Sequence, residues 1–331
     1  MPSRRWPSLS GLENLVIRFV SWLGLLCLLT ACGDAPSTSD ARAPRYEFVD
    51  LTDDFIRFWD RTQTFEEGAR VAAFKKEFGA LAPDFYGASR FADTAPERVD
   101  QRIAKALQDF PSMREEYTKT ARSFEAMLRP AIRTFQDAFP DMQALPPVYL
   151  LHSLGEMDGG TRTLSGQMAL VFGADVMVSA HDYEDEEPFL HHELFHVYHQ
   201  QFFPECDQVW CGLWTEGLAV YAAQQLNPDA SDSQLLLTKP EPIRAQVDAH
   251  LEEAICAART RLSSNESSDM RALFSFERLS PHVPPRAGYY IGYLAAKRAG
   301  VTRSVAELAH LSADEVRPLL TKTLDTLVVC R

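Results

Sequence analysis

Apolar residues recur every three or four positions over two long parts of the chain. From Leu51 to Phe139 this period predicts about four helices, with a kink or break at Pro130. Three further prolines are expected to separate these helices: Pro83, Pro96 and Pro111. From Pro188 onward the helical period returns and predicts helices over 188–203, 214–226, 233–259, 286–299 and 313–327.

A different pattern separates the two helical parts. Val148 to Leu151 and Met168 to Phe172 are short apolar runs with β-branched residues, and several glycines lie between them. Such runs predict strands of a small sheet. The chain has no repeat of fixed period and no glycine loop of the kind that binds nucleotides. The order of helices, small sheet and helices therefore predicts an α+β fold that is mainly α.

The N-terminal segment differs from both. An uncharged run from Phe19 to Leu29 follows three arginines, and its eleven residues are too few to span a bilayer. The run ends in Leu29-Thr30-Ala31-Cys32, which resembles the lipobox of bacterial lipoprotein signals. Residues 1–31 are then a signal peptide and Cys32 is the lipid anchor; an ordinary signal peptide or a short membrane anchor is the alternative. Gly33 is not the aspartate that retains many lipoproteins in the inner membrane, which favours the outer membrane.

Residues 32–45 are rich in Ala, Pro, Ser, Thr and Asp, and they predict a flexible tether. The chain has a formal charge of −13; without residues 1–31 it keeps 30 basic and 45 acidic residues, or −15. Such a surface repels nucleic acid. We expect an N-terminal helical region over 46–145 and a second region over 146–331 that carries the candidate chemistry.

A metal-binding pattern lies in the helix that begins near Pro188. His192, Glu193 and His196 form the motif His-Glu-x-x-His. Residues four apart on a helix differ by only about 40° around its axis, so both imidazoles can face one ion. Glu193 lies on the flank of that face, where its carboxylate can reach a water without binding the metal.

A third ligand follows twenty residues after His196, where Trp214-Thr215-Glu216-Gly217-Leu218-Ala219-Val220-Tyr221 predicts a second helix. An antiparallel return of this helix would bring Glu216 to the two histidines. Two histidines and one glutamate leave a fourth position open for water, which is typical of a catalytic zinc site.

These motifs, together with Gly288-Tyr289-Tyr290-Ile291-Gly292-Tyr293, resemble a bacterial family of predicted zinc-dependent proteases within the gluzincins, the group that includes thermolysin. The resemblance covers about residues 50–300 and is strongest over 188–226. It implies a zincin-like fold for 146–331 and peptide hydrolysis, with Glu193 as general base for an activated water. By the same analogy, Gln167 to Gly173 is the edge strand that would pair with an extended peptide.

The roles of the tyrosines and of the histidines beside the metal motif are less clearly indicated by the sequence. The developing oxyanion needs a donor, and Tyr289, Tyr290 and Tyr293 are candidates, each of which could equally be a core aromatic residue. His191 and His199 flank the ligands, and we expect them to support the ligands or to lie at the surface. A metzincin would have glycine at 199 and histidine at 202, which this chain does not have.

Four cysteines remain in the exported chain, in an oxidising compartment where three pairings are open. We favour Cys206 with Cys211, which lie in the loop between the two metal helices, and therefore Cys256 with Cys330. Four free thiols are the alternative.

Together these patterns predict a zinc-dependent peptidase in the cell envelope. It would be anchored by its N-terminal lipid, face the periplasm and act on a peptide or protein. The main alternative is a non-catalytic periplasmic lipoprotein, a binding or assembly factor that retains a zinc site. The sequence does not determine the substrate, the cleavage preference, endo- or exopeptidase action, regulation or the oligomeric state.

Overall fold

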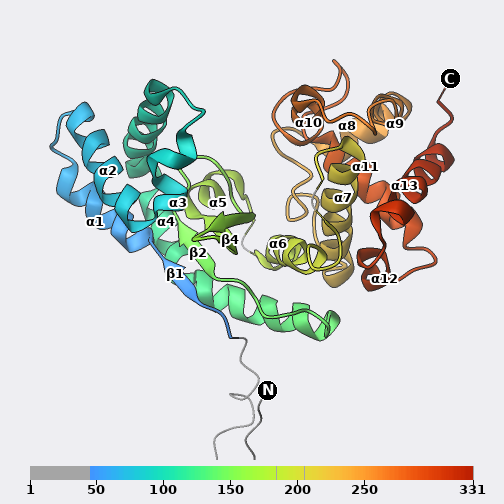
Figure 1. Ribbon diagram of the computed structural model, residues 1–331, viewed down its shortest axis with the longest axis horizontal. Helices are drawn as coiled ribbons and strands as arrows, with labels where there is room; N and C mark the ends of the chain where they lie inside the picture. Colours follow the sequence, from blue (N-terminus) through green and yellow to red (C-terminus); the bar gives the residue numbers. More distant parts are fainter. Residues whose placement is uncertain (1–44, 184, 205, 331) are drawn as a thin grey trace, which may run out of the picture. The chain divides into compact units, whose positions relative to one another are not determined.

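A small mixed sheet lies within a mainly helical fold in the computed structural model, which describes residues 45–183, 185–204 and 206–330 (Figure 1). These residues belong to one compact unit. The sheet has the order β1-β2-β4-β3, with β1–β2 and β2–β4 parallel and β3–β4 antiparallel. Its strands are β1 (Phe48–Asp50), β2 (Val148–Leu151), β3 (Thr161–Leu164) and β4 (Gln167–Gly173). The α+β, mainly α prediction is confirmed.

The sheet is larger than expected, because residues before the first helix contribute β1. Phe48 pairs with Val148, one hundred residues later, and Val148 in turn pairs with Leu170. The strand over 167–173 is therefore internal. The prediction that it forms the edge is wrong, and that position belongs to β3, which follows the glycines between β2 and β4.

Five helical segments lie between β1 and β2 in the chain. They are α1 (Thr52–Thr62), α2 (Glu67–Leu81), α3 (Pro83–Tyr86), the short 3-10 helix η2 (Ala88–Phe91) and α4 (Pro96–Ala138). Their core is rich in aromatic rings, including Phe55, Phe74 and Phe78, which are at most 1% exposed.

One long helix, α4, replaces the separate helices expected around Pro111 and Pro130, since it runs through both prolines. Pro111 has no N–H to donate to the carbonyl of Leu107, four residues earlier. The indole Nε1–H of Trp59 on α1 donates to that carbonyl instead, at 2.9 Å. A side chain from another helix thus satisfies the group that the proline leaves open, and the helix continues.

The second half of the chain is almost entirely helical. Its helices are α5 (Ala174–Ala180), α6 (Glu187–His199), α7 (Val209–Leu226), α8 (Ile243–Ala249), α9 (Leu251–Arg259), α10 (Ser267–Phe274), α11 (Ala287–Ala299), α12 (Val305–Ala309) and α13 (Ala313–Leu327). α6 contacts α4 and β3 on one side and α7 on the other (Figure 1). The helix expected over 233–259 is divided into α8 and α9 by a turn at His250, and residues 233–242 of that range are not helical.

Two glycines allow α7 and α11 to pack closely. A Cβ atom at Gly217 would lie 2.0 Å from the carbonyl carbon of Gly292, and one at Gly292 would lie 2.0 Å from the carbonyl oxygen of Leu213. Any side chain at either position would push the helices apart. Because Gly217 follows Glu216 directly, this contact also determines how α7 lies against α11 at the position of Glu216.

Candidate metal centre

The helix that carries the motif is buried on nearly every side. α6 begins at Glu187, with Pro188 in its first turn, and eleven of its thirteen residues are buried. His192 and Glu193 are only 4% and 5% exposed. Polar side chains are rarely buried in this way without partners, so the contacts of His192 and Glu193 indicate their roles.

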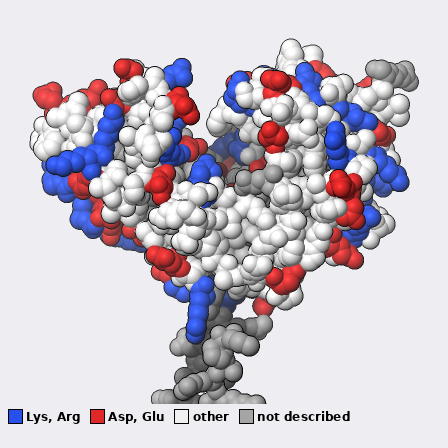
Figure 2. Space-filling view, viewed as in Figure 1, with Lys and Arg blue, Asp and Glu red and all other residues white. Residues whose placement is uncertain are grey.

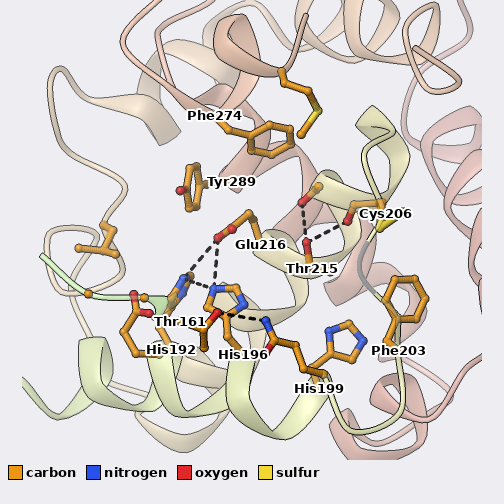
Figure 3. Close-up of a pocket in the computed structure, with 18 of the residues that line it drawn as sticks. Thr161, His192, His196, His199, Phe203, Cys206, Thr215, Glu216, Phe274 and Tyr289 are labelled. Carbon is orange, nitrogen blue, oxygen red and sulfur yellow. Dashed lines mark hydrogen bonds and ion pairs between the residues drawn. A yellow bond between two sulfur atoms is a disulfide. The ribbon is translucent and has the colours of Figure 1, made fainter. Parts of the chain in front are cut away.

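Three side chains converge in front of α6. The Nε2 atoms of His192 and His196 are 3.1 Å apart, and Oε2 of Glu216 lies 3.5 Å from the first and 3.4 Å from the second (Figure 3). Ligand atoms held about 2.1 Å from one metal ion in a tetrahedral arrangement are about 3.4 Å apart. His192, His196 and Glu216 can therefore hold a metal ion.

The charges of this group suit ligation. Burial alone would raise the pKa of Glu216, but the charge of His196 and hydrogen bonds with both imidazoles lower it below its ordinary value. Burial lowers the pKa of His192. Burial also opposes protonation of His196, yet the charge of Glu216 outweighs it and raises the pKa of His196 to about 9. The carboxylate is thus anionic and His192 neutral at neutral pH, and a metal ion would displace the proton of His196 when it binds.

Glu193 lies beside these ligands but takes no part in their contacts. Its Oε2 atom is buried and has no hydrogen-bond partner among the described residues. Burial raises the pKa of Glu193 to about 8. A Cβ atom at Gly159 would lie 2.8 Å from Cγ of Glu193, so the bare backbone at this position makes room for the side chain. A buried carboxylate with a raised pKa and a free oxygen is suited to proton transfer.

The group opens into a cavity of about 420 Å³. Its lining comes from the loop before β3, from β3 itself and from α6, α7, α10 and α11. Its apolar walls are Phe203, Leu236, Met270 and Phe274. Figure 3 shows Tyr289 and Phe274 on one side of the ligands, with His199, Phe203 and Cys206 on the other. Figure 2 shows a hollow in the surface with acidic and basic side chains along its sides.

The three tyrosines differ in position. Tyr289 lines the cavity, and its ring centroid is 6.4 Å from that of His192. Tyr290 donates its hydroxyl to Asp248 at 2.9 Å, and Tyr293 packs against Tyr221 and Tyr290. Only Tyr289 of the three is in the cavity lining.

The two flanking histidines are buried, and neither lies at the surface. His191 lies against the carbonyl of Ala131 at 3.1 Å and the side chain of Asn227 at 2.9 Å. His199 lines the cavity and stacks on Phe203, and burial lowers its pKa to about 3. His191 thus ties α6 to α4 and α7, and His199 is a neutral part of the cavity wall.

A second group, His250, Glu253 and His282, could also hold an ion among the residues described. It lies outside the cavity lining, and the side chain of His282 is 61% exposed. Water competes for an exposed site of this kind, and no buried carboxylate with a raised pKa comparable to that of Glu193 belongs to the group.

Sequence reasoning overlooked the acidic and basic residues around the cavity. Asp158 and Arg286 both line it, and neither belongs to the metal motif. Asp158 stands before Gly159-Gly160, where the glycines indicate a turn; Arg286 follows two prolines just before α11. These local signals mark loops, but they do not show that the two loops meet at the metal ligands.

Asp158 is held by a buried histidine that the sequence left without a role. Nε2 of His181 lies 3.3 Å from Asp158 and Nδ1 lies 2.9 Å from Glu186; the His181 side chain is 3% exposed. Burial alone would lower the pKa of His181, but hydrogen bonds to both carboxylates raise it to about 9. Glu186 is therefore part of a buried ion pair.

This ion pair predicts a loss of stability at alkaline pH. The pKa of His181 rises from about 6.5 in the unfolded chain to about 9 in the folded one, so its contribution is complete below pH 6.5 and disappears as the pH rises to about 9. We expect the free energy of unfolding to fall by about 3 kcal/mol over this range. Urea unfolding at several pH values should show this fall in the wild type and a smaller one in His181→Gln. Equal slopes for the two proteins would contradict the assignment.

Both disulfides have the predicted pairing. Cys206 is bonded to Cys211 and Cys256 to Cys330, with sequence separations of 5 and 74 residues. Cys206 and Cys211 also line the cavity. Two such bonds indicate an oxidising, extracytoplasmic location. Among the described residues, no helix has the length and apolar character needed to cross a membrane. Cys32 and the expected signal peptide lie outside the described residues.

Comparisons with known proteins found no relative of this chain. The chain matches no protein-family model, no curated protein and no solved structure.

Proposed function

We propose that this chain is a zinc-dependent peptidase of the cell envelope, with His192, His196 and Glu216 as metal ligands and Glu193 as general base. One observation carries the proposal: the three ligand atoms are separated by 3.1–3.5 Å, and the carboxylate beside them has a buried, unpartnered oxygen. A purely structural zinc site would normally close its fourth position with a protein ligand and would not require Glu193.

Zinc in this site would supply Lewis acidity and lower the pKa of a water molecule. The charge of a bound metal ion would favour the ionised form of Glu193. In that form Glu193 accepts a proton from the attacking water and then donates it to the leaving amine. Its raised pKa allows it to hold that proton between the two steps. The hydroxyl of Tyr289, the one tyrosine of the three in the cavity lining, donates a hydrogen bond to the developing oxyanion.

The peptide would bind in an extended form beside β3. This strand pairs with β4 along one edge, and its residues Thr161 and Arg162 line the cavity next to the ligands. An added strand gains backbone hydrogen bonds whatever its side chains are, while the cavity walls select among side chains. The open strand edge thus supports a peptide substrate.

The location follows from the disulfides and the N-terminal motif together. The disulfides indicate export. Lipidation at Cys32 and residence at the outer membrane, facing the periplasm, are the finer parts of the proposal, and they rest on the lipobox resemblance.

Purified mature protein should contain zinc and cleave members of a mixed peptide library. Removal of the metal by a chelator should abolish cleavage, and added zinc should restore it, because the metal and Glu193 act together. Metal analysis and mass spectrometry of the library provide the measurements. Bound zinc with no cleavage of any peptide would instead favour the non-catalytic binding protein.

A further inference from the structure

Arg286 is held in an unusual backbone conformation at the cavity. It is the N-cap residue of α11, with φ 63° and ψ 16°, in the left-handed region that residues other than glycine rarely adopt. Four such residues occur in the described part of the chain, and two of them, Leu236 and Arg286, line the cavity. Strained residues of this kind concentrate at functional sites, where the surrounding structure maintains them.

The guanidinium of Arg286 lacks a carboxylate partner. Its Cζ atom lies 4.6 Å from the ring centroid of Tyr289, and no ion pair joins it to a carboxylate of the described residues. The other arginine of the lining, Arg162, differs, because it lies 3.5 Å from Glu156 and donates to the carbonyl of Thr161 at 2.8 Å.

The carboxylates nearest to Arg286 in the cavity are already engaged. Asp158 pairs with His181, and Glu216 contacts both histidines of the metal group. Arg286 forms a side-chain hydrogen bond with Tyr289 and is attracted by the charges of Asp158 and Glu216, but no carboxylate pairs with it directly. A partly buried guanidinium without a directly bound anion favours the binding of an incoming carboxylate. The planar guanidinium fits a carboxylate with two parallel hydrogen bonds.

We propose that Arg286 is a specificity-determining residue that binds a carboxylate of the substrate close to the scissile bond. This inference rests on the proposed peptidase function. The Tyr289 ring lies 6.4 Å from the His192 ring, and Arg286 lies against that tyrosine. An extended peptide advances about 3.3 Å per residue, so a carboxylate one or two residues from the scissile bond can reach Arg286. It comes from an Asp or Glu side chain or from the C-terminus of a short peptide.

Matched substrates separate the two sources. Zinc-loaded mature protein is given peptides that differ only by Glu or Gln near the cleaved bond, and peptides that end in a free acid or an amide. We expect the wild type to favour one carboxylate form by about 10- to 100-fold in kcat/KM, the factor that a charge-assisted hydrogen bond supplies. Arg286→Gln should remove this preference mainly through a higher KM, and Arg286→Lys should retain part of it.

Arg298→Gln is the matched control. Arg298 is an exposed cation on the same helix, so its loss removes the same charge and should leave the preference unchanged. Zinc content and melting temperature verify that each Arg286 variant is folded. An equal fall in kcat on every peptide would identify a group that acts in the transition state and would overturn the proposal.

A binding measurement separates this inference from the peptidase proposal. Calorimetry with zinc-loaded Glu193→Gln should show tighter binding of the acidic peptide than of its neutral counterpart, and adding Arg286→Gln should abolish the difference. Cleavage without a carboxylate preference would overturn the role of Arg286 alone. A preference in binding without any cleavage by the wild type would overturn the peptidase alone, and equal or absent binding of both peptides would overturn the role of Arg286.

Discussion

Glu193→Gln is expected to lower kcat for peptide cleavage by about 10²- to 10⁴-fold, the range that general base catalysis contributes, while the protein keeps its zinc. The amide has nearly the shape of the carboxylate but cannot accept the proton of the attacking water. Since Glu193 makes none of the contacts within the ligand group, its loss leaves those ligands in place. Steady-state kinetics and metal analysis of the same preparation provide the measurement.

Ligand variants should behave in the opposite way. His192→Ala, His196→Ala and Glu216→Ala are each expected to weaken zinc binding by more than about 100-fold, since even partners that only support a ligand contribute 10- to 100-fold. His282→Ala is the control, because it alters a histidine of the exposed second group. Loss of zinc from Glu193→Gln, or full zinc occupancy in Glu216→Ala, would show that the roles are assigned wrongly.

Removal of the Cys256–Cys330 disulfide should cause the larger loss of stability. Its ends are 74 residues apart, and the chain-entropy model assigns such a closed loop about 4 kcal/mol, against about 2 kcal/mol for the five-residue separation of Cys206 and Cys211. Paired Cys→Ser variants avoid reducing agents, which bind zinc. Urea unfolding of the two double variants gives the comparison.

The short disulfide should matter more for activity. It ties the loop that follows α6 to the first turn of α7, the helix that carries Glu216, and both of its cysteines line the cavity. The Cys206/Cys211 double variant is therefore expected to lose zinc affinity and kcat/KM while it loses less stability. Equal stability losses in the two double variants would contradict the loop-length argument, and unchanged zinc affinity would contradict the role given to the short bridge.

Local patterns determined the parts of the site that depend on neighbouring residues. The spacing of His192 and His196 requires only one helical turn, so the sequence predicted their shared face. The bounds of α13 were also correct, because Ser312 and Glu315 form a capping box that starts the helix at the next residue. The disulfide pairing followed from a short loop and the two cysteines that remained.

Tertiary contacts decided what local patterns left open. The continuity of α4 through Pro111 depends on a hydrogen bond from Trp59. Strand β1 depends on pairing between Phe48 and Val148. Neither contact has a sequence signal, because its partners are far apart along the chain.

The lining of the cavity could not be predicted from the sequence either, because it also depends on contacts between distant residues. Successive residues on a helix point about 100° apart, so whether Tyr289 or Tyr290 faces the candidate metal group depends on how α11 is rotated against α7. The close contact of Gly217 with Gly292 sets that packing. Arg286 is brought to the cavity by a backbone conformation that no residue preference predicts, and His181 is charged only because the fold encloses it with two carboxylates. The sequence by itself thus determined the group of side chains that can hold a metal ion and the carboxylate beside it, and the packing of distant elements decided which groups surround them.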